Sequence, residues 1–172
     1  MNGNCVPYQR RALYLALTVP MIAMYVAIAV LLWQVSKASL LIYGALFIIV
    51  ALGQSYVCVY WQCPYVGKFA PCVGGFCLPS SRIALLFKNA KRTERRYNIA
   101  VTSAFAALLG IIVVPLYFLY QLHIAFLLIY LVVVLAYAVA FLWLICPACA
   151  TRQVCPGGQT STKLRGMITR QD

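Results

Sequence analysis

Four long apolar stretches dominate this chain and limit what it can fold into. They cover residues 12–34, 40–61, 99–120 and 122–145, and each is at least as long as the roughly 20 residues that a helix needs to cross a bilayer. Only 9% of the 172 residues are charged, whereas about a quarter are charged in a typical soluble domain. The sequence therefore predicts an all-α membrane protein with four transmembrane helices.

The positions of the positive charges predict how these helices are oriented. Of the 14 Lys and Arg residues, only Lys37 lies between the first two stretches, and the connection around Gln121 contains none. Because cytoplasmic segments carry the excess of Lys and Arg, we expect a multi-pass protein of the cell membrane with both termini and the central loop in the cytoplasm. The net charge of +12 is then a topology signal, and nucleic-acid binding is not expected.

The chain also consists of two copies of one motif, each built on a helical hairpin. An Arg pair opens each copy, and each copy closes on a tryptophan, a Cys-Pro dipeptide, seven further residues and Cys-x-Gly-Gly. The matching residues are Trp61, Cys63-Pro64 and Cys72-Val73-Gly74-Gly75 in the first copy, and Trp143, Cys146-Pro147 and Cys155-Pro156-Gly157-Gly158 in the second. Each copy crosses the membrane twice and returns to the same side, so both copies have the same orientation. We therefore expect them to be pseudo-symmetric about an axis along the membrane normal.

This duplication divides the chain into four parts. Residues 1–77 and 95–158 form the two hairpin repeats, residues 78–94 connect them, and residues 159–172 form a basic tail. The connecting segment has an apolar strip followed by Lys and Arg, so we expect a short helix lying on the anionic inner leaflet. A docking surface for an acidic partner is the alternative. Gln54 and Ser55 are the notable polar pair within a span, and we expect an interhelical hydrogen bond there, with a ligand contact as the alternative.

Eight cysteines carry the distinctive chemistry of the chain. The predicted topology puts all of them near the cytoplasmic boundary, where thiols usually stay reduced and clustered cysteines more often bind metals or act in redox reactions. The repeated motif should bring four of them together around the pseudo-twofold axis, namely Cys63, Cys72, Cys146 and Cys155. Four thiolates suit a tetrahedral zinc ion or an iron–sulfur cluster, and each Gly-Gly suits a tight turn beside the sulfur.

The remaining cysteines have no counterpart in the other copy. Cys77 and Cys149 would complete a second metal site or replace one of the four ligands, since Cys146-Pro147-Ala148-Cys149 has C-x-x-C spacing. Thiol–disulfide chemistry and plain packing are the alternatives for all six loop cysteines. Cys58 lies inside the second apolar stretch, so we interpret it as a buried apolar residue.

The layout resembles a known family of electron-transfer subunits. Cys58-x₄-Cys63-Pro64 is similar to the C-x₃-C-P motif that follows the hairpins in the four-helix membrane quinol-dehydrogenase subunits of periplasmic nitrate and nitrous oxide respiration. The spacing here is one residue longer, no cysteine precedes Cys146 in the second copy, and the paired ferredoxin motifs of that family are absent. The resemblance covers the layout and implies an electron-transfer role, but no functional residue is carried over.

Other chemistries lack the residues they need. Haem bound within a membrane usually takes histidine ligands, and His123 is the single histidine, so no haem is expected. The acidic residues are Glu94 and Asp172, both outside the apolar stretches. Because proton pumps and ion-coupled transporters normally keep an ionisable group within the bilayer, that class is disfavoured.

Three functional hypotheses remain. The first is a small subunit with a cysteine-ligated iron–sulfur or zinc site, serving electron transfer or assembly in a larger membrane complex. The second is a thiol oxidoreductase that exchanges electrons with quinone through Cys146 and Cys149, and it resembles vitamin K epoxide reductase in its four spans and its C-x-x-C near the membrane. The third is a structural subunit stapled by zinc.

Overall fold

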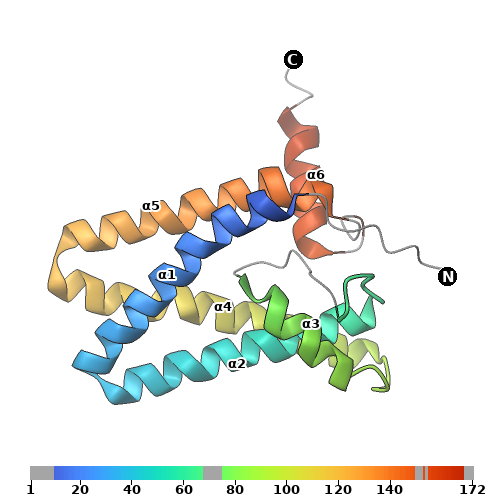
Figure 1. Cartoon of the computed structure of the whole chain (residues 1–172), viewed down its shortest axis with the longest axis horizontal. Coiled ribbons are helices and arrows are strands. Elements are labelled where there is room, and N and C mark those ends of the chain that lie inside the picture. The colour runs from blue at the N-terminus through green and yellow to red at the C-terminus, as the bar shows by residue number, and fades with distance from the viewer. Residues whose placement is uncertain (1–9, 68–74, 150–152, 154, 169–172) are drawn as a thin grey trace.

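The computed structural model describes residues 10–67, 75–149, 153 and 155–168. Every regular element in these ranges is a helix. The elements are α1 (Arg11–Val35), α2 (Lys37–Tyr60), α3 (Cys77–Leu86), α4 (Glu94–Leu122), α5 (Ile124–Ala140), the π-helical turn η2 (Phe141–Ile145), the 3₁₀ turn η3 (Cys146–Ala148) and α6 (Pro156–Ile168). Figure 1 shows the long helices side by side, with α6 projecting away from them.

Four of these helices are long and apolar enough to cross a membrane, which confirms the prediction of an all-helical, multi-pass membrane protein. They are α1, α2, α4 and the continuous helix Ile124–Ala148 that joins α5 to its two terminal turns. Large apolar side chains cover their outer surfaces, for example Leu41 at 74% and Val132 at 66% exposed. Such a surface is stable only against lipid tails or other apolar surfaces, so these helices contact the bilayer.

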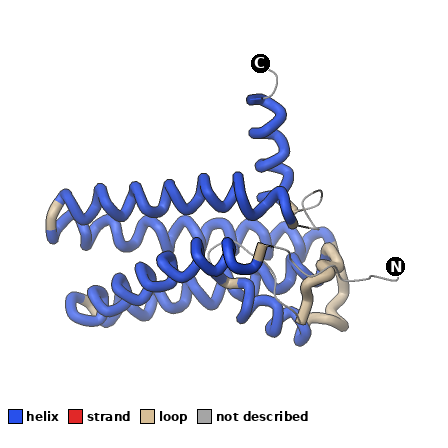
Figure 2. Tube along the Cα trace, turned by 45° about the horizontal axis from the view of Figure 1, so that its top comes forward, coloured by secondary structure: helices blue, strands red, loops and turns tan. Residues whose placement is uncertain are grey.

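Single residues separate the helices at one end of the bundle. Ser36 lies between α1 and α2, and its Oγ accepts a hydrogen bond from the Ser39 N–H (3.3 Å). His123 lies between α4 and α5, and its Nδ1 accepts from the Ala125 N–H (3.1 Å). Both residues are extended and cap the helix that follows. The longer connections lie at the opposite end, as Figure 2 shows, and we call that end the cysteine end.

The two halves of the chain meet mainly through α2 and α4, the most extensive contact between any two helices described. Gly53 makes this approach possible, because a Cβ there would lie 2.7 Å from the Ala104 Cβ and 2.8 Å from the Ala100 carbonyl oxygen. The contact between α1 and α5, which a twofold axis would make its equivalent, is much smaller. The pseudo-twofold relation therefore stays a prediction, and the packing between halves is unequal.

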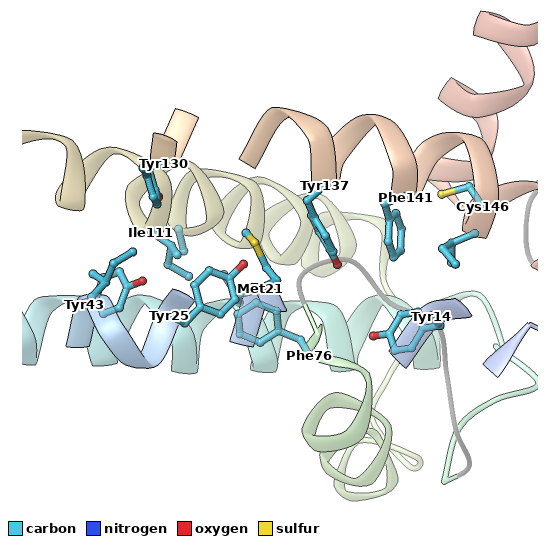
Figure 3. Close-up of a cluster of buried hydrophobic side chains, with 14 of the residues drawn as sticks. Tyr14, Met21, Tyr25, Tyr43, Phe76, Ile111, Tyr130, Tyr137, Phe141 and Cys146 are labelled. Atoms are coloured by element: carbon cyan, nitrogen blue, oxygen red, sulfur yellow. The ribbon is translucent and has the colours of Figure 1, made fainter. Parts of the chain in front are cut away.

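Tyrosines fill the interior between α1, α2 and α5. Figure 3 shows Tyr14, Tyr25, Tyr43, Tyr130 and Tyr137 directed into the bundle, with Phe141 and then Cys146 following along the second half. The rings of Tyr14, Tyr25 and Tyr43 pack edge-to-face on phenylalanines, as the 5.1 Å between the Tyr25 and Phe47 ring centroids illustrates. The Tyr130 hydroxyl donates to the Ile112 carbonyl of α4 (3.2 Å). This aromatic core fixes α1 against α5 and so positions the end of α5.

Helix α3 begins beside the middle of α2. The Ser80 Oγ donates to the Ala51 carbonyl (3.4 Å), and the Ser55 Oγ donates to the Ser80 carbonyl (2.9 Å). Ala51 lies about 14 Å before the end of α2 at 1.5 Å per residue. The expected interhelical hydrogen bond of Ser55 is therefore confirmed. Contact of residues 78–94 with lipid headgroups stays a prediction. Helix α3, which contains the first part of this segment, starts alongside α2 rather than beyond its end.

Candidate thiol site

Five of the cysteines have described side chains, and all lie towards the cysteine end. They are Cys58, Cys63, Cys146, Cys149 and Cys155, and each is a thiol rather than half of a disulfide. Helices α2 and α5 both run from the single-residue turns to the cysteine end, which is why their last residues share one end of the bundle (Figure 1). The expected ligand Cys72 and the side chain of Cys77 lie outside the described residues.

The first thiol set forms where α2 ends. The Cys63 N–H donates to the Cys58 carbonyl (2.9 Å) and the Gln62 N–H to the Val59 carbonyl (3.2 Å), with Gln62 in the left-handed region at φ 51°. These two bonds and the left-handed residue between them define a Schellman motif. That motif brings together the side chains of the third-last helical residue and the second residue beyond the cap. In this chain those residues are Cys58 and Cys63.

The two thiols of this pair are hydrogen-bonded to each other. This hydrogen bond with Cys58, and then burial, raise the pKa of Cys63 far above its ordinary value of 9.0, although a hydrogen bond from the backbone of Tyr65 acts in the opposite direction. Cys63 is therefore a neutral thiol at physiological pH. The pair is half-buried, since both residues keep part of their surface exposed.

The second Cys-Pro dipeptide follows a different helix end. The Cys146 N–H donates to the Phe141 carbonyl, which closes a π turn, and the Cys149 N–H then donates to the Cys146 carbonyl (3.2 Å). Two residues separate Trp143 from Cys146, whereas one separates Trp61 from Cys63. A π turn holds one more residue than an α turn, so it accommodates this additional residue.

The carbonyl groups of the π turn are satisfied from outside α5. The Leu142 carbonyl finds no donor in Pro147, which has no N–H, and accepts from the Ser161 Oγ of α6 instead (2.7 Å). The Leu144 carbonyl accepts from Arg10 Nη1, at the start of α1 (2.8 Å). The end of α5 is thus held by α6 on one side and by the start of α1 on the other.

The second thiol set gathers where η3 ends and α6 begins. The Cys146 thiol is buried, and its Sγ lies 3.7 Å from where a Cβ on Gly157 would be. The thiols of Cys155 and Cys149 are both close enough to Cys146 to interact with it electrostatically. The Gln159 N–H donates to the Cys155 carbonyl (3.0 Å), so Cys155 immediately precedes the first turn of α6.

The glycines of the two motifs have different backbone conformations. Gly75 has φ +79°, as expected for a tight turn, directly before Phe76, the N-cap residue of α3, and it packs against Thr18 and Ile22 of α1. Gly157 and Gly158 instead belong to the first turn of α6. The expectation of two equivalent glycine turns was therefore wrong for the second copy, because Pro156 starts a helix there.

The predicted ligand set is only partly visible. Of the predicted ligands with described side chains, Cys149 and Cys155 interact electrostatically with Cys146. The structure pairs Cys63 with Cys58, a residue that the sequence alone led us to interpret as packing. Within the described ranges, no three Cys, His, Asp or Glu side chains are arranged as a ready metal-binding group. The convergence of all four predicted ligands stays a prediction, since Cys72 is outside those ranges.

Comparisons of the chain with protein-family models, with curated proteins and with solved structures found no match. The class is defined by the fold and the residues alone. This is an all-helical membrane protein with four candidate spans and two thiol sets towards one end of its bundle.

Proposed function

We propose that this chain is a small membrane subunit that binds a metal through cysteine thiolates at the cytoplasmic end of its bundle. The observation that carries the proposal is that Cys146, Cys149 and Cys155 follow one another along the short segment from η3 to the start of α6, where Cys149 and Cys155 both interact electrostatically with Cys146. Thiolate ligands suit zinc and iron–sulfur clusters. A fourth protein ligand would come from the first copy of the motif, where Cys63, Cys72 and Cys77 are the candidates.

The surroundings of the second thiol set support this role. A metal site needs ligands held by rigid backbone, and the backbone before Cys146 is fixed by hydrogen bonds from Arg10 and Ser161. Metal binding requires deprotonated thiols, so the proton of the buried Cys146 would leave as the site loads. Bound iron–sulfur would supply one-electron transfer, whereas zinc would supply structural stability.

The wider role follows from the shape and charge of the chain. The described residues include no separate folded domain beyond the helices, and large apolar side chains cover the spans. We infer that the chain works as an electron-transfer or assembly component of a larger membrane complex. The Lys and Arg residues on the connections at the cysteine end support a cytoplasmic location for that end.

Metal analysis of the protein tests this proposal. Anaerobic purification followed by elemental analysis and electron paramagnetic resonance should find iron or zinc in stoichiometric amounts. Cys149→Ser and Cys155→Ser should each lose most of the metal, whereas Cys58→Ser, at a cysteine outside the proposed ligands, should keep it. Full-length protein that contains neither metal after anaerobic purification would overturn the proposal.

A thiol oxidoreductase is the second candidate, and the backbone of Cys146–Cys149 favours it. The 3₁₀ turn closes with the Cys149 N–H donating to the Cys146 carbonyl, which puts the two cysteines of the C-x-x-C one turn apart. Oxidation would join the two sulfurs and pass two electrons and two protons to a quinone, giving quinol. Quinone reduction by metal-free protein would favour this candidate, whereas stoichiometric zinc without redox activity would indicate the zinc-stapled scaffold.

A further inference from the structure

We propose that Cys58 and Cys63 form a redox-active dithiol that closes reversibly to a disulfide across the end of α2. The site lies at the first Cys-Pro dipeptide and is separate from the second thiol set. It rests on the contact between Cys58 and Cys63, and it requires the fourth metal ligand of the proposed function to be Cys72 or Cys77 rather than Cys63.

The backbone brings the two sulfurs together before any reaction. The Schellman motif normally brings two apolar side chains into contact, one from the last turn of the helix and one from beyond the cap. Here the backbone bonds of Cys63 and Gln62 to Cys58 and Val59 put two thiols in that place. The thiols are already hydrogen-bonded, so closure needs a small approach of the sulfurs and no rearrangement of helices.

The surroundings also suit thiol exchange. Both cysteines are half-buried rather than enclosed, so a small reagent can reach them from the end of the helix. Gln62, between the two cysteines, is exposed, whereas Trp61 packs against Tyr60 and Tyr97 and Cys63 packs against the edge of the core.

The reaction is an ordinary thiol–disulfide exchange with a low-molecular-weight disulfide as oxidant. One thiol of the pair loses its proton and attacks a sulfur of the external disulfide, which gives a mixed disulfide and releases one external thiolate. The second cysteine then attacks the mixed disulfide, forms the Cys58–Cys63 bond and releases the second external thiolate. The pair loses two electrons and two protons, and two molecules of external thiol are formed.

Closing this bond would staple the end of α2 to the loop that begins at Cys63. The same loop carries Gly67, whose N–H donates to the Ser81 carbonyl of α3 (3.1 Å). The oxidised and reduced forms would therefore differ in how firmly the loop after α2 is held. A cytoplasmic location keeps the pair reduced under ordinary conditions and makes the disulfide the form produced by oxidative stress.

Differential alkylation of the full-length protein in detergent tests the proposal. The protein is equilibrated in buffers with increasing ratios of oxidised to reduced glutathione, and free thiols are labelled and mapped by mass spectrometry. We expect the labels on Cys58 and Cys63 to disappear together and to return after reduction. The peptide that holds both cysteines should then lack the mass of two hydrogen atoms.

Variants and the metal content complete the experiment. In Cys58→Ser the remaining Cys63 should stay open to the label or carry one glutathione, and Cys63→Ser should behave in the same way. The wild-type map is decisive even where a variant folds poorly. Labelling of both cysteines at every glutathione ratio, or pairing of Cys63 with another cysteine, would overturn the proposal. Metal content measured on the same samples reports separately on the proposed metal site.

Discussion

The two Cys-Pro dipeptides end two corresponding helices in different ways. At the end of α2 the chain leaves the helix through a left-handed Gln62, and Cys63 turns back onto Cys58. At the end of α5 the helix widens into a π turn and carries Cys146 forward to α6. One additional residue between tryptophan and cysteine separates the two outcomes. A repeated motif therefore predicts where cysteines lie along the chain, but the helix end decides which partners their sulfurs meet.

Deleting Leu144 should have the largest effect on this difference. The deletion gives the second copy the tryptophan-to-cysteine spacing of the first, and it turns Cys146 by about 100° around the helix, away from α6. It also removes the residue whose carbonyl accepts from Arg10. We expect a loss of about 3 kcal/mol or more of stability, measured by thermal unfolding in detergent, together with loss of bound metal.

Leu144→Ala is the matched control for the deletion. It keeps the spacing and the carbonyl, and removes a side chain that is 40% exposed to the surroundings of the bundle. Its unfolding temperature should stay close to that of the wild type. Equal effects of the deletion and the substitution would show that the π turn does not position Cys146.

Ser161→Ala should have the next largest effect. Ser161 is buried, and its hydroxyl is the donor to a carbonyl that Pro147 leaves without a backbone partner. Removing it should cost about 1–2 kcal/mol and loosen α6 from the end of α5. Hydrogen exchange should accelerate in α6 while α3 is unchanged. Thr162→Ala is the control, because that hydroxyl donates only within α6, to the Gly158 carbonyl (2.9 Å).

Gln62→Gly should stabilise the first helix end. Gln62 is exposed and its φ of 51° is a conformation that favours glycine, so the substitution should add about 1 kcal/mol of stability. Gln62→Ala keeps a Cβ in the left-handed region and should bring no such gain. Equal unfolding temperatures for both variants would mean that the left-handed residue costs this helix end nothing.

The spans were predictable because they follow a simple physical rule. Apolar length alone located the four long helices, and only their ends were missed, as where α4 begins at Glu94 because polar residues extend a helix beyond its apolar stretch. The thiol sets were harder. A Schellman motif usually has glycine at its left-handed position. Here that position is Gln62, so the sequence did not indicate that Cys63 would turn back onto Cys58, and Cys58 was interpreted as a packing residue. The sequence contained one indication of the π turn, namely the additional residue between Trp143 and Cys146.

The position of α3 could not be predicted for a related reason. Its apolar strip and following basic residues are typical of a helix on the membrane surface. The serines determine where this helix starts, since Ser80 and Ser55 join α3 to the middle of α2 through backbone carbonyls. Phe76 then packs on Phe47, with ring centroids 5.3 Å apart. Such contacts depend on which face of α2 is open, and that is settled only when α2 has packed against α4.

The smallest expected effect is a pH dependence at the first helix end. The folded protein raises the pKa of Cys63 above its ordinary value of 9.0, through the hydrogen bond with Cys58 and burial. Below that value the thiol is protonated in both the folded and the unfolded chain, so its contribution to stability is complete. Above it the unfolded chain loses the proton while the folded chain keeps it, and stability must fall as pH rises.

The reduced wild-type protein should therefore lose stability between about pH 8 and about pH 10 more steeply than Cys63→Ser, which has no such proton to lose. Unfolding midpoints of both proteins in reducing buffer measure the difference. If stability falls equally with pH in the wild type and Cys63→Ser, the hydrogen-bonded pair of Cys58 and Cys63 does not exist in solution. The two helix ends would then differ only in their backbone conformation.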